Sequence, residues 1–167
     1  MKKIGIIILV CVVLYFVLTV PIIKVIQFEQ TRVKTGDTYY IKRTDETKFQ
    51  IVFTHSIHLT DVIETYEIDE KRIRLLSMDY SDVAIGMPAY AEEGQTLIYE
   101  DGFYTLQYDE AILDDFTLYI GDVDYELTFK YEAQQYNLKE VLGRGNTYNI
   151  SIQNISILEW MKGEEMK

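Results

Sequence analysis

The residues best suited to chemistry lie in one short segment, in which Phe53-Thr54-His55-Ser56 is followed by Thr60 and Glu64. Histidine and glutamate can transfer protons, and serine can act as a nucleophile. Neighbouring residues of a strand point to opposite faces, so His55 and Ser56 are poorly placed to act together as base and nucleophile. The pattern therefore favours either a hydrogen-bonded turn at a strand end or a contact with a ligand or partner.

A second segment of interest is the loop over residues 80–88, which ends in Gly86-Met87-Pro88. Glycine can adopt positive φ, and a residue that precedes proline favours an extended backbone. Pro88 is the only proline in residues 25–167, so we expect a loop of defined shape, which serves either binding or the scaffold alone. The candidate partner- or ligand-binding residues are His55, Ser56, Thr60, Glu64, Gly86, Met87 and Pro88.

Metal and cofactor chemistry has little support in the sequence. One cysteine and two histidines exclude a cysteine-cluster zinc site. Asp122 and Asp124 form an Asp-x-Asp pair, but the other residues of a calcium-binding EF-hand loop are missing. We expect no metal, no cofactor and no catalytic set. The net charge of −11 also has the wrong sign for nucleic-acid binding.

The N-terminus carries the strongest pattern of the chain. Lys2 and Lys3 precede an uncharged, mostly apolar run of 20 residues from Ile4 to Ile23, which Lys24 closes. A helix of that length spans about 30 Å, the thickness of a bilayer core. The leading lysines favour a cytoplasmic N-terminus. We therefore expect a single-pass anchor in the cell membrane through residues 4–23, with the rest of the chain extracytoplasmic.

Two alternatives to an uncleaved anchor are less well supported. A cleaved signal peptide needs small residues at its exit, and residues 19–23 offer no such pair. A lipoprotein would use Cys11, but Leu9 and Val10 precede it where a small residue is required. Residues 1–24 carry +3, which leaves −14 on residues 25–167. That acidic part is either simply solvated or meets a basic partner surface.

Beyond residue 37 the dominant period is two, which is typical of half-buried antiparallel strands. We expect an anchor over residues 1–24, a stalk over 25–37 and an all-β domain over 38–167. The fold class is an antiparallel sandwich or partly open barrel, with one short helix at Leu138–Leu142. The nine expected strands are 38–43, 48–55, 61–68, 71–79, 95–99, 103–108, 115–120, 125–131 and 147–153.

The two candidate segments, in this order behind an apolar N-terminus, resemble a family of small extracytoplasmic proteins of unassigned function. Genes of that family often lie beside TAXI-type tripartite (TRAP) transporters. The family pattern has a strand, His-Ser-Val, Thr-Pro and Glu, then Gly-x-Gly-Leu-Pro and an acidic-Gly turn before an aromatic residue. The matching residues are His55, Ser56, Ile57, Thr60, Glu64, Gly86, Met87, Pro88 and Asp101-Gly102-Phe103.

The resemblance covers roughly residues 48–153, with two departures. Asp61 replaces the proline, and Ala84 replaces the first glycine of the later motif. It implies an accessory or interaction module that contacts a TRAP permease or its solute-binding protein, and it carries over no catalytic residues. Two other hypotheses remain: a cell-envelope enzyme that uses His55 or Glu64, and a purely structural envelope protein.

Overall fold

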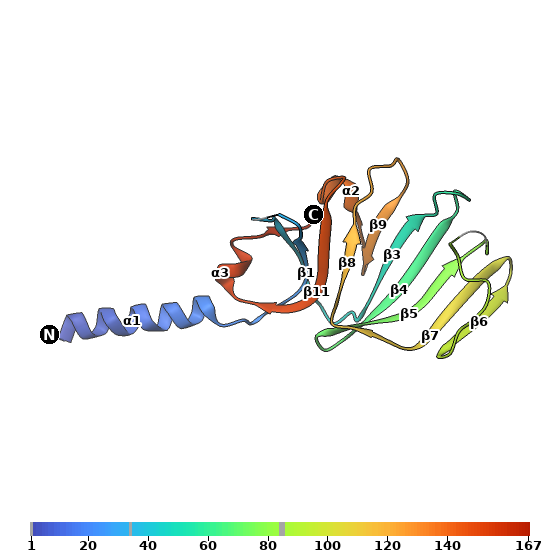
Figure 1. The fold of residues 1–167 in the computed structure, drawn as a ribbon. Helices are drawn as coiled ribbons and strands as arrows, with labels where there is room; N and C mark the ends of the chain where they lie inside the picture. The colour runs from blue at the N-terminus through green and yellow to red at the C-terminus, as the bar shows by residue number, and fades with distance from the viewer. Residues whose placement is uncertain (1, 34, 84–85) are drawn as a thin grey trace.

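The protein is described by a computed structural model that covers residues 2–33, 35–83 and 86–167, with only the backbone of Lys2 (Figure 1). In these residues, twelve strands form two sheets, and three helices accompany them. The helices are α1 (Lys2–Thr19), α2 (Leu138–Val141) and α3 (Ile157–Trp160). The prediction of a mostly β, largely antiparallel domain is thereby confirmed, with twelve strands in place of the nine expected.

The first sheet has five strands and contains both ends of the β-domain. Its order is β12-β2-β1-β11-β8, and every pairing is antiparallel except the short parallel contact of β12 with β2. The strands are β12 (Glu164–Glu165), β2 (Thr38–Lys42), β1 (Ile23–Gln30), β11 (Thr147–Ile155) and β8 (Asp115–Tyr119).

The second sheet has seven strands in the order β10-β9-β3-β4-β5-β7-β6, all antiparallel. In Figure 1, β7 and β6 lie at the far end of this fan, away from β1 and β11. The strands are β10 (Gln134–Asn137), β9 (Leu127–Tyr131), β3 (Lys48–Thr54), β4 (Asp61–Asp69), β5 (Arg72–Tyr80), β7 (Phe103–Leu113) and β6 (Gln95–Glu100).

The main core lies between the two sheets and is rich in aromatic rings. Phe28 of β1 meets Phe129 of β9 edge-on, with ring centroids 5.2 Å apart. Tyr66 of β4 stacks on Phe116 of β8 at 5.2 Å. A second apolar cluster lies farther along the seven-stranded sheet, around the buried Tyr80 and its neighbours Val62 and Leu106. The inner face of the large sheet is thus covered in two separate places.

The structure differs from the expected stalk over residues 25–37. Strand β1 begins at Ile23, inside the expected anchor, and takes up the first part of this range to Gln30. It lies at the centre of the five-stranded sheet between β2 and β11. Val25, Ile26 and Phe28 are fully buried. Ile26 and Phe28 face the main core, whereas Val25 packs on the other face with Tyr40 and Ile155. Because both faces of β1 are covered, its sequence lacks the simple alternation of a half-buried strand.

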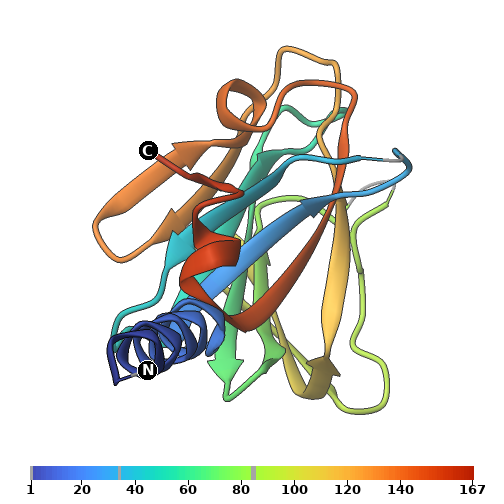
Figure 2. The same cartoon turned by 90° about the vertical axis from the view of Figure 1, so that its left-hand side faces the viewer.

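The C-terminal residues fold back on the five-stranded sheet. Ser156 caps α3, and Glu159 completes a capping box with it. Trp160, the only tryptophan of the sequence, stacks on Tyr40 with ring centroids 5.7 Å apart. Figure 2 shows α3 beside the end of α1 that joins the β-domain, and the two helices are in contact.

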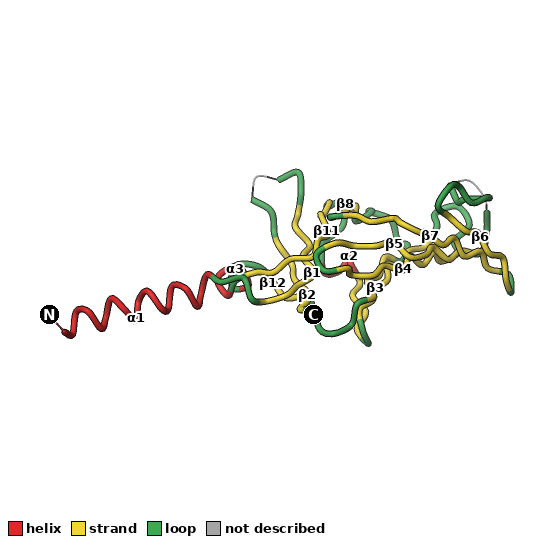
Figure 3. The backbone as a smooth tube through the Cα atoms, turned by 90° about the horizontal axis from the view of Figure 1, so that it is seen from below, coloured by secondary structure: helices red, strands yellow, loops and turns green. Residues whose placement is uncertain are grey.

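Helix α1 projects from the β-domain as a separate rod (Figures 1 and 3). Its large side chains, including Leu9, Tyr15 and Phe16, are exposed. In the described part of the chain, no helix combines the length and the apolar character needed to cross a membrane.

Candidate functional site: a pocket between the two sheets

A pocket of about 470 Å³ opens between the two sheets. Strands β3 and β4 of the large sheet form its floor, and β8 of the small sheet forms the opposite wall. The loop over residues 121–126 and Lys139 of α2 complete the rim. The volume lies within the usual range for small-molecule sites.

Glu64 lies in the floor of this pocket. The alternation of β4 directs Val62, Glu64 and Tyr66 to one face. The residues directly across from Glu64 are apolar on both sides, Ile51 on β3 and Met78 on β5. Burial raises the pKa of the Glu64 carboxyl, and a hydrogen bond from Tyr66 partly opposes this rise.

Tyr66 is the immediate partner of Glu64. Its hydroxyl donates to Glu64 Oε2 over 2.7 Å. The Tyr66 ring stacks on Phe49 at 5.0 Å and on Phe116 at 5.2 Å, so its direction is fixed by packing. Burial and the nearby Glu64 carboxylate raise the pKa of Tyr66 far above its ordinary value. The hydroxyl therefore stays protonated and acts as a permanent donor to the carboxylate.

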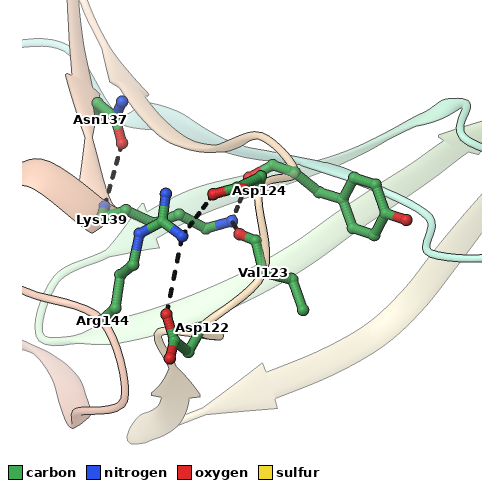
Figure 4. Close-up of polar contacts among 7 residues, drawn as sticks. Asp122, Val123, Asp124, Asn137, Lys139 and Arg144 are labelled. Atoms are coloured by element: carbon green, nitrogen blue, oxygen red, sulfur yellow. Dashed lines mark hydrogen bonds and ion pairs between the residues drawn. The ribbon is translucent and has the colours of Figure 1, made fainter.

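The rim loop is held by two basic side chains (Figure 4). The Lys139 ammonium donates to the backbone carbonyls of Val123 and Tyr125. The guanidinium of Arg144 lies 2.7 Å from Asp124 Oδ1 and 3.7 Å from Asp122 Oδ1. The Asp-x-Asp pair that raised the question of calcium is therefore occupied by an arginine. Lys139 and Arg144 fix the loop that forms one wall of the pocket.

The predicted residues of the β3–β4 loop divide between two environments. Ser56 lines the pocket together with Glu64. The His55 amide donates to the Thr60 carbonyl over 2.8 Å, and this bond closes the loop at its base. His55 is not among the residues that line the Glu64 pocket. His55 therefore does not share this pocket with Glu64, as an acid–base pair acting there would require.

His55 instead faces the loop that follows β5. Its ring stacks on His58 at 5.4 Å, and His58 Nδ1 lies 3.2 Å from Asp82 Oδ2. A β-carbon placed on Gly86 would lie 3.7 Å from His55 Nε2, an ordinary van der Waals contact. The structure therefore brings together the two segments that the sequence singled out. Ala84, one of the departures from the family pattern, and Ile85 lie outside the described residues.

The Gly86-Met87-Pro88 segment borders a second pocket of about 480 Å³, with Leu106 and Tyr108. Gly86 has a φ of +92°, as its residue type predicted. The Pro88 carbonyl accepts a hydrogen bond from Tyr80 Oη over 2.6 Å, and Met87 packs on the cluster around Tyr80. The loop of defined shape is thus anchored on the inner face of the large sheet.

Among the pocket residues that sequence reasoning missed are the hydrogen-bond partner of Glu64, Tyr66, and the residue that holds the rim loop, Lys139. Tyr66 could have been found, because it follows Glu64 by two positions and a strand places such residues on one face. Lys139 had no such signal, since only the three-dimensional fold brings α2 to the rim loop. Tyr108 is also electrostatically linked to Glu64: burial and the Glu64 charge both raise the pKa of Tyr108.

A family model described as a domain of unknown function (DUF1850) matches residues 49–138 of the chain. This range includes β3, β4 and the loop after β5, and thus all the predicted site residues. Comparison with curated proteins and with solved structures gave no match.

Proposed function

The chain belongs to the DUF1850 family of domains of unknown function, and we propose that this member is a membrane-anchored, extracytoplasmic interaction module. In this proposal it serves as an accessory of a TRAP-type solute transporter. The Glu64 pocket and the adjoining His55 and Gly86–Pro88 loops form its contact site. The single observation that carries the site is a carboxylate set in the floor of an open, apolar pocket.

The pocket supports binding better than it supports catalysis. Glu64 is held by a stacked tyrosine, which gives it a fixed direction before any ligand arrives. Ser56 is the only nucleophile type that reaches the pocket from the β3–β4 loop, and neither histidine lines the pocket beside it. A positioned carboxylate without a base–nucleophile pair suits recognition of a ligand or partner group.

The anchor rests on the chemistry of residues 4–23. The exposed side chains of α1 are apolar along its length, and the uncharged run continues past the helix to Ile23. Exposed apolar surface of this extent is costly in water and calls for a lipid environment. Lys2 and Lys3 favour a cytoplasmic N-terminus, which would leave the acidic β-domain outside.

The transporter partner rests on the resemblance described above. The paired motifs around His55 and Gly86 resemble those of a family whose genes often accompany TRAP transporters. Those two motifs lie against each other in the fold, so a partner could contact both at once.

Crosslinked co-purification of the full-length protein from its native membranes tests this function. We expect a TRAP permease or its solute-binding protein to be recovered, and Glu64→Ala to reduce that recovery without unfolding the domain. Glu67→Ala is the matched control, because Glu67 occupies the same strand and the opposite face. Absence of any specific partner, under conditions in which a known complex survives, would contradict the accessory role.

A further inference from the structure

The walls of the Glu64 pocket are predominantly apolar. The residues that supply this surface come from both sheets: Ile51, Phe53, Leu127, Phe116 and Leu118. A ligand body that fills this space gains free energy by burying apolar surface. The walls therefore select for a small molecule, or a side chain of a partner, with an aliphatic or aromatic body.

The pocket carries negative charge that no free cationic side chain among its described lining residues balances. Among the described residues, Tyr66 is the only donor to the Glu64 carboxylate, and it bonds to Oε2 alone. Lys139 lines the pocket, but its ammonium is engaged by the carbonyls of Val123 and Tyr125. Glu126, also part of the lining, adds a further negative charge. A desolvated carboxylate that lacks a cationic partner is costly, and a cation that binds it offsets the cost.

From this geometry we infer that the pocket binds a ligand with an apolar body and an ammonium group, which donates to the free oxygen of Glu64. The inference rests on the proposed contact site and specifies the chemical class that it takes. Aromatic rings at the pocket, Phe53, Tyr66 and Phe116, suit a cation as well. The charge of −14 on residues 25–167 attracts cations and repels anions.

Proton binding competes with such a ligand. Besides Glu64, the titratable groups that line the pocket are Tyr66, Tyr119, Tyr125, Glu126 and Lys139. Tyr108 on β7 is linked electrostatically to Glu64. Tyr66 and Tyr108 stay neutral at ordinary pH, so Glu64 is the group in the floor of the pocket whose charge changes. Ammonium binding therefore requires the ionised carboxylate and weakens as the pH falls through its raised pKa.

The experiment compares three probes of similar shape and different charge on the full-length protein in a neutral maltoside detergent. The probes are 2-phenylethylammonium, 2-phenylethanol and 3-phenylpropionate, and calorimetry measures their dissociation constants. We expect the ammonium to bind at least about 10-fold more tightly than the alcohol, and the carboxylate to bind weakest. Equal or tighter binding of the alcohol or the carboxylate would overturn the inference.

Variants locate the binding on Glu64. Glu64→Gln keeps the shape and removes the charge, so we expect a loss of ammonium affinity of about 10-fold or more. Glu64→Asp keeps the charge and should retain a preference for ammonium over alcohol. Glu67→Gln, on the outer face of β4, should leave all three affinities unchanged. Unchanged ammonium binding in Glu64→Gln would overturn the assignment.

The outcome is separable from that of the proposed function. If no ammonium preference is found while Glu64→Ala still lowers transporter recovery, the ligand class is wrong and the accessory role stands. If ammonium binding depends on Glu64 while no transporter is recovered, the pocket chemistry is supported and the accessory role is wrong.

Discussion

The Tyr66 hydroxyl lies 2.7 Å from Glu64 Oε2, and it donates a hydrogen bond to the only carboxylate on the inner face of β4. The two residues are two positions apart on one strand, so both side chains face the pocket. Stacking on Phe49 and Phe116 fixes the tyrosine ring. One oxygen of the carboxylate is thus held by the protein, while the pocket gives access to the residue from outside.

Removal of this donor should destabilise the fold. We expect Tyr66→Phe to lower the free energy of unfolding by about 1–3 kcal/mol at neutral pH, because a part-buried carboxylate loses its donor. The pKa of Glu64 should rise further, since the lost bond had opposed the rise. Chemical denaturation and an NMR titration of the Glu64 carboxyl measure the two effects. Tyr119→Phe is the control, because Tyr119 is exposed; an equal loss in both variants would contradict the role of the bond.

The stability of the protein should depend on pH through Glu64. Burial raises its pKa in the folded state, so the folded protein binds a proton at pH values where the unfolded chain has released it. Stability from this group is full below the ordinary glutamate pKa and is lost as the pH rises through the raised value. We expect Glu64→Gln to gain stability relative to wild type as the pH rises from 4 to 7.

Denaturation of both proteins across that pH range measures the difference in their free energies of unfolding. The contributions of other titrating groups are the same in both proteins and cancel in this difference. Glu67→Gln, on the opposite face of the same strand, should show no such trend. A constant difference between Glu64→Gln and wild type at all pH values would show that the carboxyl is not perturbed by burial.

The strands were largely predictable because most of them are half-buried. In β9, Thr128 and Lys130 separate apolar residues, and β3 alternates in the same way except at Val52. Each of the nine predicted ranges overlaps a strand. Strand β1 was missed because Val25 and Ile26 are buried on opposite faces, which removes the alternation. Strands β10 and β12 were missed because they have only four and two residues, and strands this short show no readable period.

The sequence could identify single residues of the candidate site but not the contacts between segments that are far apart in the chain. Glu64 and Ser56 were identified by residue type and share the first pocket. His55 and Gly86 were identified separately. They lie close together because β4 and β5 pair antiparallel, which places the loop before β4 and the loop after β5 at the same end of the sheet. Lys139 was not identifiable, because its hydrogen bonds to Val123 and Tyr125 depend on the position of α2 in the fold.

The Lys139 ammonium should control the order of the rim loop. We expect Lys139→Met to speed amide exchange in residues 121–126 roughly 30-fold, because it removes two hydrogen bonds to that loop, each worth about 1 kcal/mol. Global unfolding should change little, since the loop lies outside the core. Hydrogen exchange followed by mass spectrometry measures this. Lys71→Met, at an exposed turn, is the control. Unchanged amide exchange in residues 121–126 of Lys139→Met would contradict the proposed role of Lys139 in holding the loop.

The C-terminal segment should prove to be an integral part of the five-stranded sheet. A β-carbon on Gly163 would lie 2.3 Å from Tyr40 Cε2 and 2.7 Å from the backbone oxygen of Thr38. The backbone atom cannot yield easily, so we expect Gly163→Ala to lower the free energy of unfolding by about 1–3 kcal/mol. The same displacement would disturb the stack of Trp160 on Tyr40.

Denaturation curves and the fluorescence of Trp160, the only tryptophan, measure both effects. Gly121→Ala is the matched control, because its β-carbon would meet Val123 Cγ2 at an ordinary 3.7 Å. We expect that variant to change stability by less than about 0.5 kcal/mol. If Gly163→Ala were equally mild, then β12 and the buried Met166 that follows it would not hold the edge of β2.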